Sequence, residues 1–131
     1  MRVVHYLNQY FAGLGEEAQA DLPPTSYPGP VGPGRLLQST LGAEASVVGT
    51  VVCGDGFFAD RPDEAAPLVL GLIEAFTPDV VVAGPAFGAG RYGLACGRVC
   101  DEATARLGIP ALTAMHRDNA AVAVHGDQII S

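Results

Sequence analysis

Short apolar runs recur along this chain, and each has the length of a β-strand. They lie at residues 2–7, 45–53, 78–83 and 111–115, and residues 127–130 resemble the start of one more strand. The run at 78–83 shows no alternation of apolar and polar residues, which is typical of a strand buried on both faces of a parallel sheet. The pattern therefore predicts four or five strands in one sheet.

Helical stretches separate these runs, and each has recognisable ends. Pro33 suits the first turn of a helix, and that helix is expected to stop at Gly42. A second helix is expected over residues 62–76, with Asp60 as its N-cap and acidic residues in its first turn. A third is expected over residues 92–107, where a glycine and a proline follow.

Alternating strands and helices predict an α/β fold. We expect a single domain over residues 1–131, with the three layers of a Rossmann or flavodoxin-like fold. Its sheet would be mostly parallel, with four to five strands and helices on both faces. Residues 8–33 hold five prolines and cannot form a regular helix or a central strand. This long arm is expected to be functional or to form an interface.

Composition indicates a globular chain and excludes some classes of partner. Of the 131 residues, 49% are hydrophobic and 16% are charged, and the formal net charge is −7. Nucleic-acid binding is excluded because no basic patch offsets phosphate repulsion. No apolar run approaches the roughly 20 residues of a membrane span, and no signal peptide is recognisable, so we expect a cytoplasmic location. The three cysteines argue against a disulfide framework, and no ligand spacing indicates zinc.

The stretch at residues 84–97, GPAFGAGRYGLACG, is the strongest candidate for a ligand site. It is expected to be a strand-to-helix loop, and open α/β sheets bind ligands outside the carboxyl ends of their strands. Gly88 and Gly90 allow close approach of the backbone, and amides at the helix start bind carboxylate or phosphate. Arg91 adds donors suited to a carboxylate. The alternative is a tight turn that packs the helix against the sheet.

The same loop matches the dinucleotide spacing G-x-G-x-x-G at residues 88–93. However, residues 109–115, about 20 positions further on, hold no acidic residue to bind a ribose. A nucleotide-binding Rossmann-like domain is therefore only an alternative interpretation. Phe87 and Ala89 lie in this loop and complete the predicted substrate-binding set.

Candidate catalytic groups lie at or near the predicted strand ends. His116 is the best acid–base candidate, and Tyr92 is expected to orient or protonate a substrate. Asn8 and Asp55 would form the polar wall of the site. Cys53 is a candidate nucleophile, although a nearby carboxylate raises a thiol pKa, and a buried core thiol is the alternative.

The remaining histidines and cysteines are expected to be structural. His5 lies inside an apolar strand and is predicted to be a satisfied core histidine, whereas His125 is predicted to be a solvated turn residue. Cys96 and Cys100 have the spacing of one helix face and are expected to pack in the core. Residues 54–56 are expected to form a turn after the second strand.

Five segments together carry a resemblance to a known family. They are VHYLNQYFAGLG at 4–15, GPVGPGRLLQ at 29–38, VVCGD at 51–55, PDVVVAGPAFGAGRYGLACG at 78–97 and LGIPALTAMHRDNAAV at 107–122. In order and with compatible spacing, they resemble the N-terminal part of the substrate-specific component B of glycine/sarcosine/betaine reductases, to which the D-proline reductase proteins are related. The resemblance runs through nearly all of this chain.

The resemblance implies an oxidoreductase subunit that acts on a small amino acid or amine within a hetero-oligomer. In the family, a pyruvoyl-bearing partner forms an imine with the substrate amine, and a selenol or thiol of component B attacks the substrate carbon. The family's selenocysteine or cysteine lies far downstream of the segments matched here. We therefore expect no cofactor in this chain, and a partner chain resembling the remainder of component B to supply the catalytic thiol, selenol or pyruvoyl group.

Two further interpretations remain open at this point. Pyruvoyl enzymes arise by cleavage before a serine or cysteine, and the terminal residues up to Ser131 would suit the released front chain. A natural stop or a boundary within a longer sequence fits equally well. The chain could also be a non-catalytic subunit that binds substrate or assists assembly, which would be distinguished by whether Arg91 and Cys53 face a common pocket.

Overall fold

The computed structural model describes residues 1–14, 19–126 and 129–130. Its centre is a six-stranded sheet in the order β2-β3-β1-β4-β5-β6. Strands β3, β1, β4, β5 and β6 are parallel, and β2 pairs antiparallel with β3. The predicted α/β class is confirmed, but the sheet is mixed and has one more strand than expected. The strands are β1 (Arg2–Asn8), β2 (Thr25–Pro28), β3 (Ser46–Cys53), β4 (Val80–Phe87), β5 (Ala111–Met115) and β6 (Ile129–Ile130).

Helices connect the parallel strands. Their bounds are α1 (Gly34–Leu41), α2 (Asp55–Asp60), α3 (Pro62–Ala75), α4 (Gly90–Glu102), a π-helical turn (Ala103–Leu107) and α5 (Ala121–His125). Three of them, α1, α3 and α4, correspond to the predicted helices, whereas α2 and α5 were not predicted. The expected turn at 54–56 was wrong, because the first turn of α2 begins at Asp55. Asp60 was also wrongly assigned as a cap: it ends α2, and Arg61 holds the N-cap position of α3 without a side-chain hydrogen bond.

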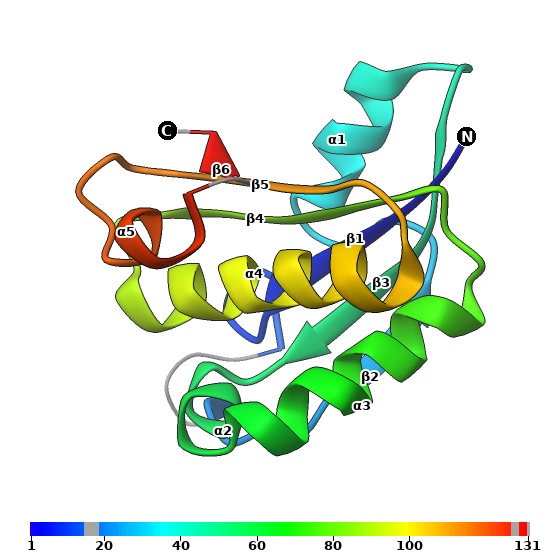
Figure 1. Cartoon of the computed structure of the whole chain (residues 1–131). Helices are drawn as coiled ribbons and strands as arrows, with labels where there is room; N and C mark the ends of the chain where they lie inside the picture. Colours follow the sequence, from blue (N-terminus) through cyan, green and yellow to red (C-terminus); the bar gives the residue numbers. More distant parts are fainter. Residues whose placement is uncertain (15–18, 127–128, 131) are drawn as a thin grey trace.

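The sheet has helices on both faces, and they cover these faces unequally. Figure 1 shows α2, α3 and α4 on one side of the sheet, called here the lower face, and α1 on the opposite, upper face. Successive residues of β1 point to opposite faces, so that Val4 and Tyr6 enter the large core under α3 and α4. Val3 enters a small cluster that includes Leu37 of α1.

The proline-rich arm at 8–33 contains β2 in its last third. This strand occupies an edge of the sheet, the position that tolerates prolines and short strands. The prediction that the arm forms no central strand is therefore confirmed. Around β2, parts of the arm pack on the upper face, where Phe11 and Tyr27 cover Leu7.

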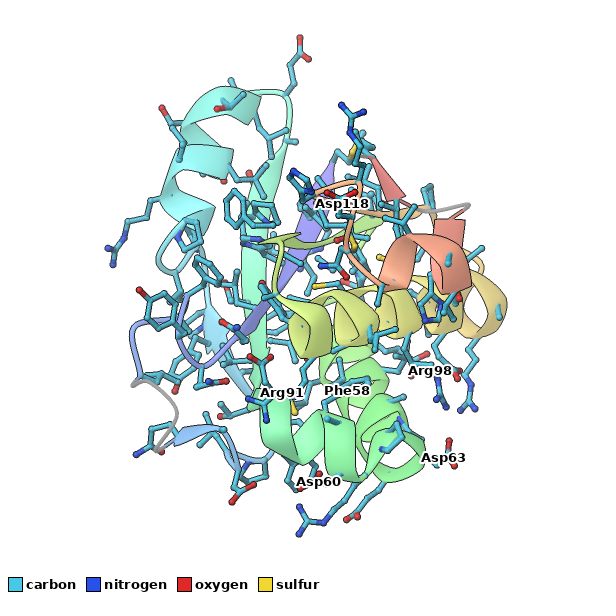
Figure 2. All side chains as sticks on the ribbon, turned by 90° about the vertical axis from the view of Figure 1, so that its left-hand side faces the viewer. Phe58, Asp60, Asp63, Arg91, Arg98 and Asp118 are labelled. Atoms are coloured by element: carbon cyan, nitrogen blue, oxygen red, sulfur yellow. The ribbon has the colours of Figure 1, made fainter. Side chains whose placement is uncertain are left out.

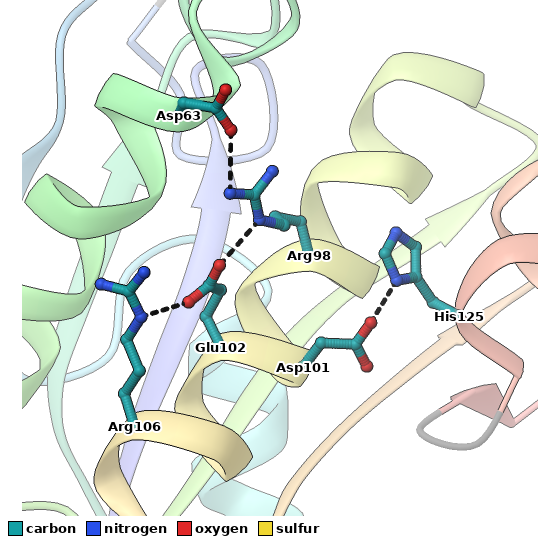
Figure 3. A network of polar contacts seen from close by, with 6 residues as sticks. All are labelled: Asp63, Arg98, Asp101, Glu102, Arg106 and His125. Carbon is teal, nitrogen blue, oxygen red and sulfur yellow. Dashed lines mark hydrogen bonds and ion pairs between the residues drawn. The ribbon is translucent and has the colours of Figure 1, made fainter.

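A polar network joins α4 to its neighbours on the outer surface (Figure 3). Arg98 donates to Glu102 at 2.9 Å and pairs with Asp63 of α3 at 3.2 Å. His125 pairs through Nδ1 with Asp101 of α4. The prediction of a solvated turn residue was wrong for His125, because α5 packs on α4 and leaves that side chain 12% exposed.

The end of the chain is described only in part. Residues 129–130 form the parallel strand β6 beside β5, whereas residues 127–128 of the predicted strand and Ser131 lie outside the described residues. Within the described ranges, no helix has the length and apolar character needed to cross a bilayer.

Candidate functional site

The carboxyl ends of the parallel strands meet at one edge of the sheet. Asn8 ends β1, Cys53 ends β3 and Phe87 ends β4, and His116 follows β5. The chain passes from β1 to β3 on one side and then returns across β1 to β4. The reversal lies between β1 and β4, and such a reversal is where open α/β sheets bind ligands.

A hydrogen-bonded polar cluster lies at the ends of β1 and β3. Asn8 Nδ2 donates to Asp55 Oδ2 at 3.0 Å, and Asn8 Oδ1 accepts from the Phe11 amide at 2.9 Å. The Asp55 amide donates to Gln9 Oε1 at 3.0 Å. Asn8 and Gln9 are both buried, so this cluster fixes the start of α2 relative to β1. The structure thus brings together the two residues predicted to form the polar wall.

The stretch at 84–97 is not a single loop, and this expectation was wrong. Strand β4 continues to Phe87, and α4 begins at Gly90, so only Gly88 and Ala89 connect them. The strand stays paired because its register with β5 shifts between Ala83 and Phe87. Gly84 takes a φ of +88° within this irregular segment, where a side chain would be strained.

The glycines of this stretch have two different roles. A Cβ atom at Gly88 or Gly90 would meet no described atom within 4 Å, so both glycines border open space. A Cβ at Gly93 would overlap the Asn119 side chain, and one at Gly97 would overlap His125. Gly93 and Gly97 are therefore packing positions of α4, and the open glycines are confined to the turn before it and its first residue.

Asn119 holds the turn between β4 and α4. Its Nδ2 donates to the carbonyl oxygens of Phe87 and Ala89, both at 3.1 Å, and its Oδ1 accepts from the Ala121 amide at 3.1 Å. The His116 amide also donates to the Phe87 carbonyl, at 2.8 Å. These bonds bring the segment after β5 directly against the end of β4.

Aromatic rings pack against one another at the carboxyl ends of β1 and β4. The Phe11 ring lies 5.9 Å from that of Phe87 and stacks on that of Tyr92 at 5.7 Å. Tyr92 is fully buried beneath them, and burial is the main cause that raises its pKa well above the usual value. Phe87 is 57% exposed and has a φ of +52°, a conformation that is unusual for a non-glycine residue and is concentrated at functional sites.

Arg91 and His116 lie in separate hollows. Arg91 lines a groove of about 370 Å³ between α2 and α4, together with Phe58, Leu94 and Arg98. Figure 2 shows Arg91 beside Phe58, with Asp118 on the other side of α4.

His116 lines a second hollow, of about 460 Å³, on the upper face. Its exposed ring accepts at Nδ1 from the Asp118 amide at 3.2 Å. The first turn of α4 thus separates the predicted carboxylate donor from the predicted acid–base residue.

The three thiols are all buried. Burial, with a smaller contribution from Asp55, raises the pKa of Cys53 to about 12. Burial also raises the pKa of Cys96, and it raises that of Cys100 to about 12. Thiols in such surroundings are protonated at neutral pH and are poor nucleophiles. The structure therefore favours the buried-thiol alternative for Cys53, which does not line the groove that contains Arg91.

His5 supports the irregular end of β4 from the upper face. Its ring is buried, and Nε2 donates to the Gly84 carbonyl oxygen at 2.6 Å. Because a carbonyl oxygen only accepts, Nδ1 carries no proton in the neutral ring, and it has no hydrogen-bond partner among the described residues. The predicted core position is confirmed, but only one ring nitrogen is satisfied.

Three residues of this edge were not assigned a role from the sequence. Gln9 and Asn119 lie in segments that follow predicted strands, and their burial through specific hydrogen bonds depends on neighbours far away in the chain. Phe11 lies in the proline-rich arm, where its partners Phe87 and Tyr92 could not be inferred. Only the position after a strand could have indicated them.

Comparison with known proteins identifies one family, in agreement with the resemblance seen in the sequence. The family model Glycine/sarcosine/betaine reductase selenoprotein B (GRDB) matches residues 1–130. The glycine reductase complex component B subunit gamma of Carboxydothermus hydrogenoformans is 52% identical over 95% of this chain, and the match spans 28% of that relative. The sarcosine reductase complex component B subunit beta of Peptoclostridium acidaminophilum is 46% identical over 98% of this chain and 30% of its own length.

A third relative is named after a further substrate, betaine. The betaine reductase complex component B subunit beta of Peptoclostridium acidaminophilum is 41% identical over 92% of this chain and 28% of its own length. The chain thus spans less than a third of the length of these relatives. No solved structure matches the chain.

Proposed function

Because this chain belongs to the Glycine/sarcosine/betaine reductase selenoprotein B family, we propose that it contributes substrate-binding residues to an amino-acid reductase complex. The substrate would be a small amino acid or amine that undergoes reductive cleavage or related C–N or C–S chemistry. The relatives with the names glycine, sarcosine and betaine reductase component B support this substrate class. The chain would be active only in a hetero-oligomeric complex.

The state of the three thiols carries the proposal that the reacting group lies elsewhere. Cys53, Cys96 and Cys100 are buried, and burial raises the pKa of each thiol. A nucleophilic cysteine must be accessible to its substrate and must react as the thiolate. These three thiols are neither accessible nor ionised at neutral pH. A thiol, selenol or pyruvoyl group outside residues 1–131 would supply the covalent chemistry, and this chain would bind and orient the substrate.

Arg91 is the residue that we assign to the substrate carboxylate. Its guanidinium has a planar set of donors that matches a carboxylate, and the exposed side chain lines an apolar groove that a substrate can enter. Arg98 lines the same groove and pairs with Asp63 and Glu102. Gly88 lines the hollow of His116 rather than this groove, so the amides beside Gly88, Ala89 and Gly90 would bind an anionic group on that side of α4.

The other predicted site residues have supporting positions in this proposal. His116 is exposed beside Phe87 and Gly88, where it would exchange a proton with a substrate or with a partner's group. Asn8 and Asp55 would hold the start of α2 at this edge of the sheet as the polar wall of the site. Tyr92 would support the Phe11 ring from below rather than contact the substrate, because it is fully buried.

A non-catalytic binding or assembly subunit is the second candidate. The separation of Arg91 and His116 into two hollows favours it, because the described residues do not form one complete catalytic pocket. The two candidates differ in what Arg91→Ala does. Loss of turnover in an intact complex supports the first, and unchanged turnover with weakened assembly supports the second.

The experiment uses a chimaera in which this chain replaces the matched segment of the Carboxydothermus subunit, assembled with the other components of that complex. We expect turnover of glycine, sarcosine or betaine. Turnover should persist in the chimaera when Cys53, Cys96 and Cys100 are each replaced by Ala, one at a time. A folded chimaera that converts none of these substrates contradicts the function. A folded Cys53→Ala chimaera that alone loses turnover contradicts the placement of the reacting group.

A further inference from the structure

An apolar surface lies on the upper face of the sheet, over strands β4, β5 and β6. Leu112 of β5 pairs with Val82 of β4, and Ala114 pairs with Ile130 of β6, so that these side chains stand side by side. Leu112 is 39% exposed and Ile130 is 61% exposed. We call this set the upper apolar surface; its members are Pro85, Phe87, Leu112, Ala114 and Ile130.

The described residues leave this surface without a helix. Strands of a parallel sheet are normally covered on both faces, because their side chains are apolar on both sides. On the lower face, α3 and α4 provide that cover (Figure 1). On the upper face, Leu37 and Leu41 of α1 reach only as far as Val80 and Val82, and β5 and β6 carry no helix of the described ranges above them (Figure 1).

The upper apolar surface is hollowed and borders the candidate site. The hollow of about 460 Å³ is lined by members of the surface and by Gly88, Met115 and His116. A hollow of this kind accepts side chains from a partner, as protein interfaces do at their apolar cores. A polypeptide seated here would have its own residues next to His116 and next to the turn that precedes α4.

We propose that the upper apolar surface is the docking surface for the polypeptide that corresponds to the remainder of a component B subunit. This inference rests on the proposed function, because it takes the relatives' complexes as the setting. More than two thirds of each of the three relatives lies outside the segment that matches this chain. A polypeptide of that length can provide a layer of helices over the upper apolar surface. Once docked there, it would place its own residues next to His116.

The test measures how fast a cysteine at position 112 reacts with a maleimide. Leu112→Cys is made in the isolated chain and in the full-length chimaera with the Carboxydothermus subunit. Leu68→Cys is the matched control, because Leu68 is an exposed leucine of α3, 48% exposed, on the lower side. The three native cysteines are buried, so the unsubstituted chain gives the background.

We expect the Leu112→Cys variant to react at least about tenfold more slowly in the chimaera than in the isolated chain, because a thiol in a packed interface reacts only through local opening. The Leu68→Cys variant should react equally fast in both. Equal rates for Leu112→Cys overturn the proposal.

A second copy of this chain is the competing occupant. Slow labelling of Leu112→Cys in the isolated chain, together with a dimer in sedimentation, would also overturn the proposal. Turnover is a separate readout. A chimaera that protects position 112 but converts no substrate supports the docking surface and contradicts the proposed function. An active chimaera in which position 112 stays accessible supports the proposed function and contradicts the docking surface.

Discussion

The two faces of the sheet differ in how far this chain completes them. On the lower face, α2, α3 and α4 enclose one large cluster that includes Tyr6, Ile73 and Tyr92. On the upper face, α1 and the proline-rich arm cover two small clusters over β1 and β3, and the upper apolar surface stays exposed. The comparison indicates that burial on the lower face stabilises the fold of this chain, whereas the upper face is where we propose that a further polypeptide docks.

The largest expected effect is the loss of a lower-face core side chain. Ile73 is fully buried, so Ile73→Ala should lower the free energy of unfolding by about 2–5 kcal/mol through lost burial and an unfilled cavity. Leu112→Ala, on the upper apolar surface, should change it by about 0.5 kcal/mol or less. Urea denaturation of the isolated chain measures both. Equal losses for the two variants would contradict the difference between the faces.

The next effect concerns the packing of α4 against the segment after β5. A Cβ at Gly93 would overlap the buried Asn119 side chain, which makes three hydrogen bonds. Gly93→Ala should therefore destabilise the fold by about 1–3 kcal/mol, as overpacking does.

Gly71 in α3 is the matched control, because a Cβ there would meet nothing within 4 Å. Gly71→Ala should stabilise the fold by up to about 1 kcal/mol, the difference in helix propensity. Thermal unfolding of both variants is the measurement. A Gly93→Ala variant as stable as Gly71→Ala would show that Asn119 moves freely.

A smaller effect is a pH dependence from His5 on the upper face. Burial lowers the pKa of His5 below 6.5, while its hydrogen bond to Gly84 acts in the opposite direction. The unfolded chain therefore binds the proton more readily than the folded chain. Stability should be full above pH 6.5 and should fall as the pH drops from 6.5 toward the folded-state pKa. His5→Gln should flatten this part of the profile in urea denaturation at several pH values. An unchanged slope would assign the pH dependence to other groups.

Much of the fold was predictable because its strands are local apolar runs. The expected strands at 2–7, 45–53, 78–83 and 111–115 all exist, since a strand buried on both faces needs apolar residues throughout. Strand β2 was not predictable, because TSYP becomes a strand only through its pairing with β3. His125 was misassigned for a similar reason, since its helix is defined by packing on α4.

The sequence predicted the location of the candidate site, at the carboxyl ends of the strands, but not the relative positions of its side chains. The rule about strand ends selected Asn8, Asp55 and His116, and the hydrogen bond between Asn8 and Asp55 shows that two of them meet. The sequence contained no information on which side of the α4 start each residue would lie. Arg91 points toward α2 and His116 lies on the upper face, which depends on the path of the chain through Gly88 and Ala89.

The steady-state kinetics of Arg91 variants in the chimaera test the central claim, that this chain binds the substrate carboxylate, most directly. A hydrogen bond to a charged group contributes about 1.5–3 kcal/mol, so Arg91→Ala should lower kcat/KM roughly ten- to hundredfold. Arg91→Lys should restore only part, because the planar fork is lost. Arg35→Ala, on exposed α1, should leave kcat/KM unchanged. An unchanged kcat/KM in a fully assembled Arg91→Ala chimaera would contradict the account.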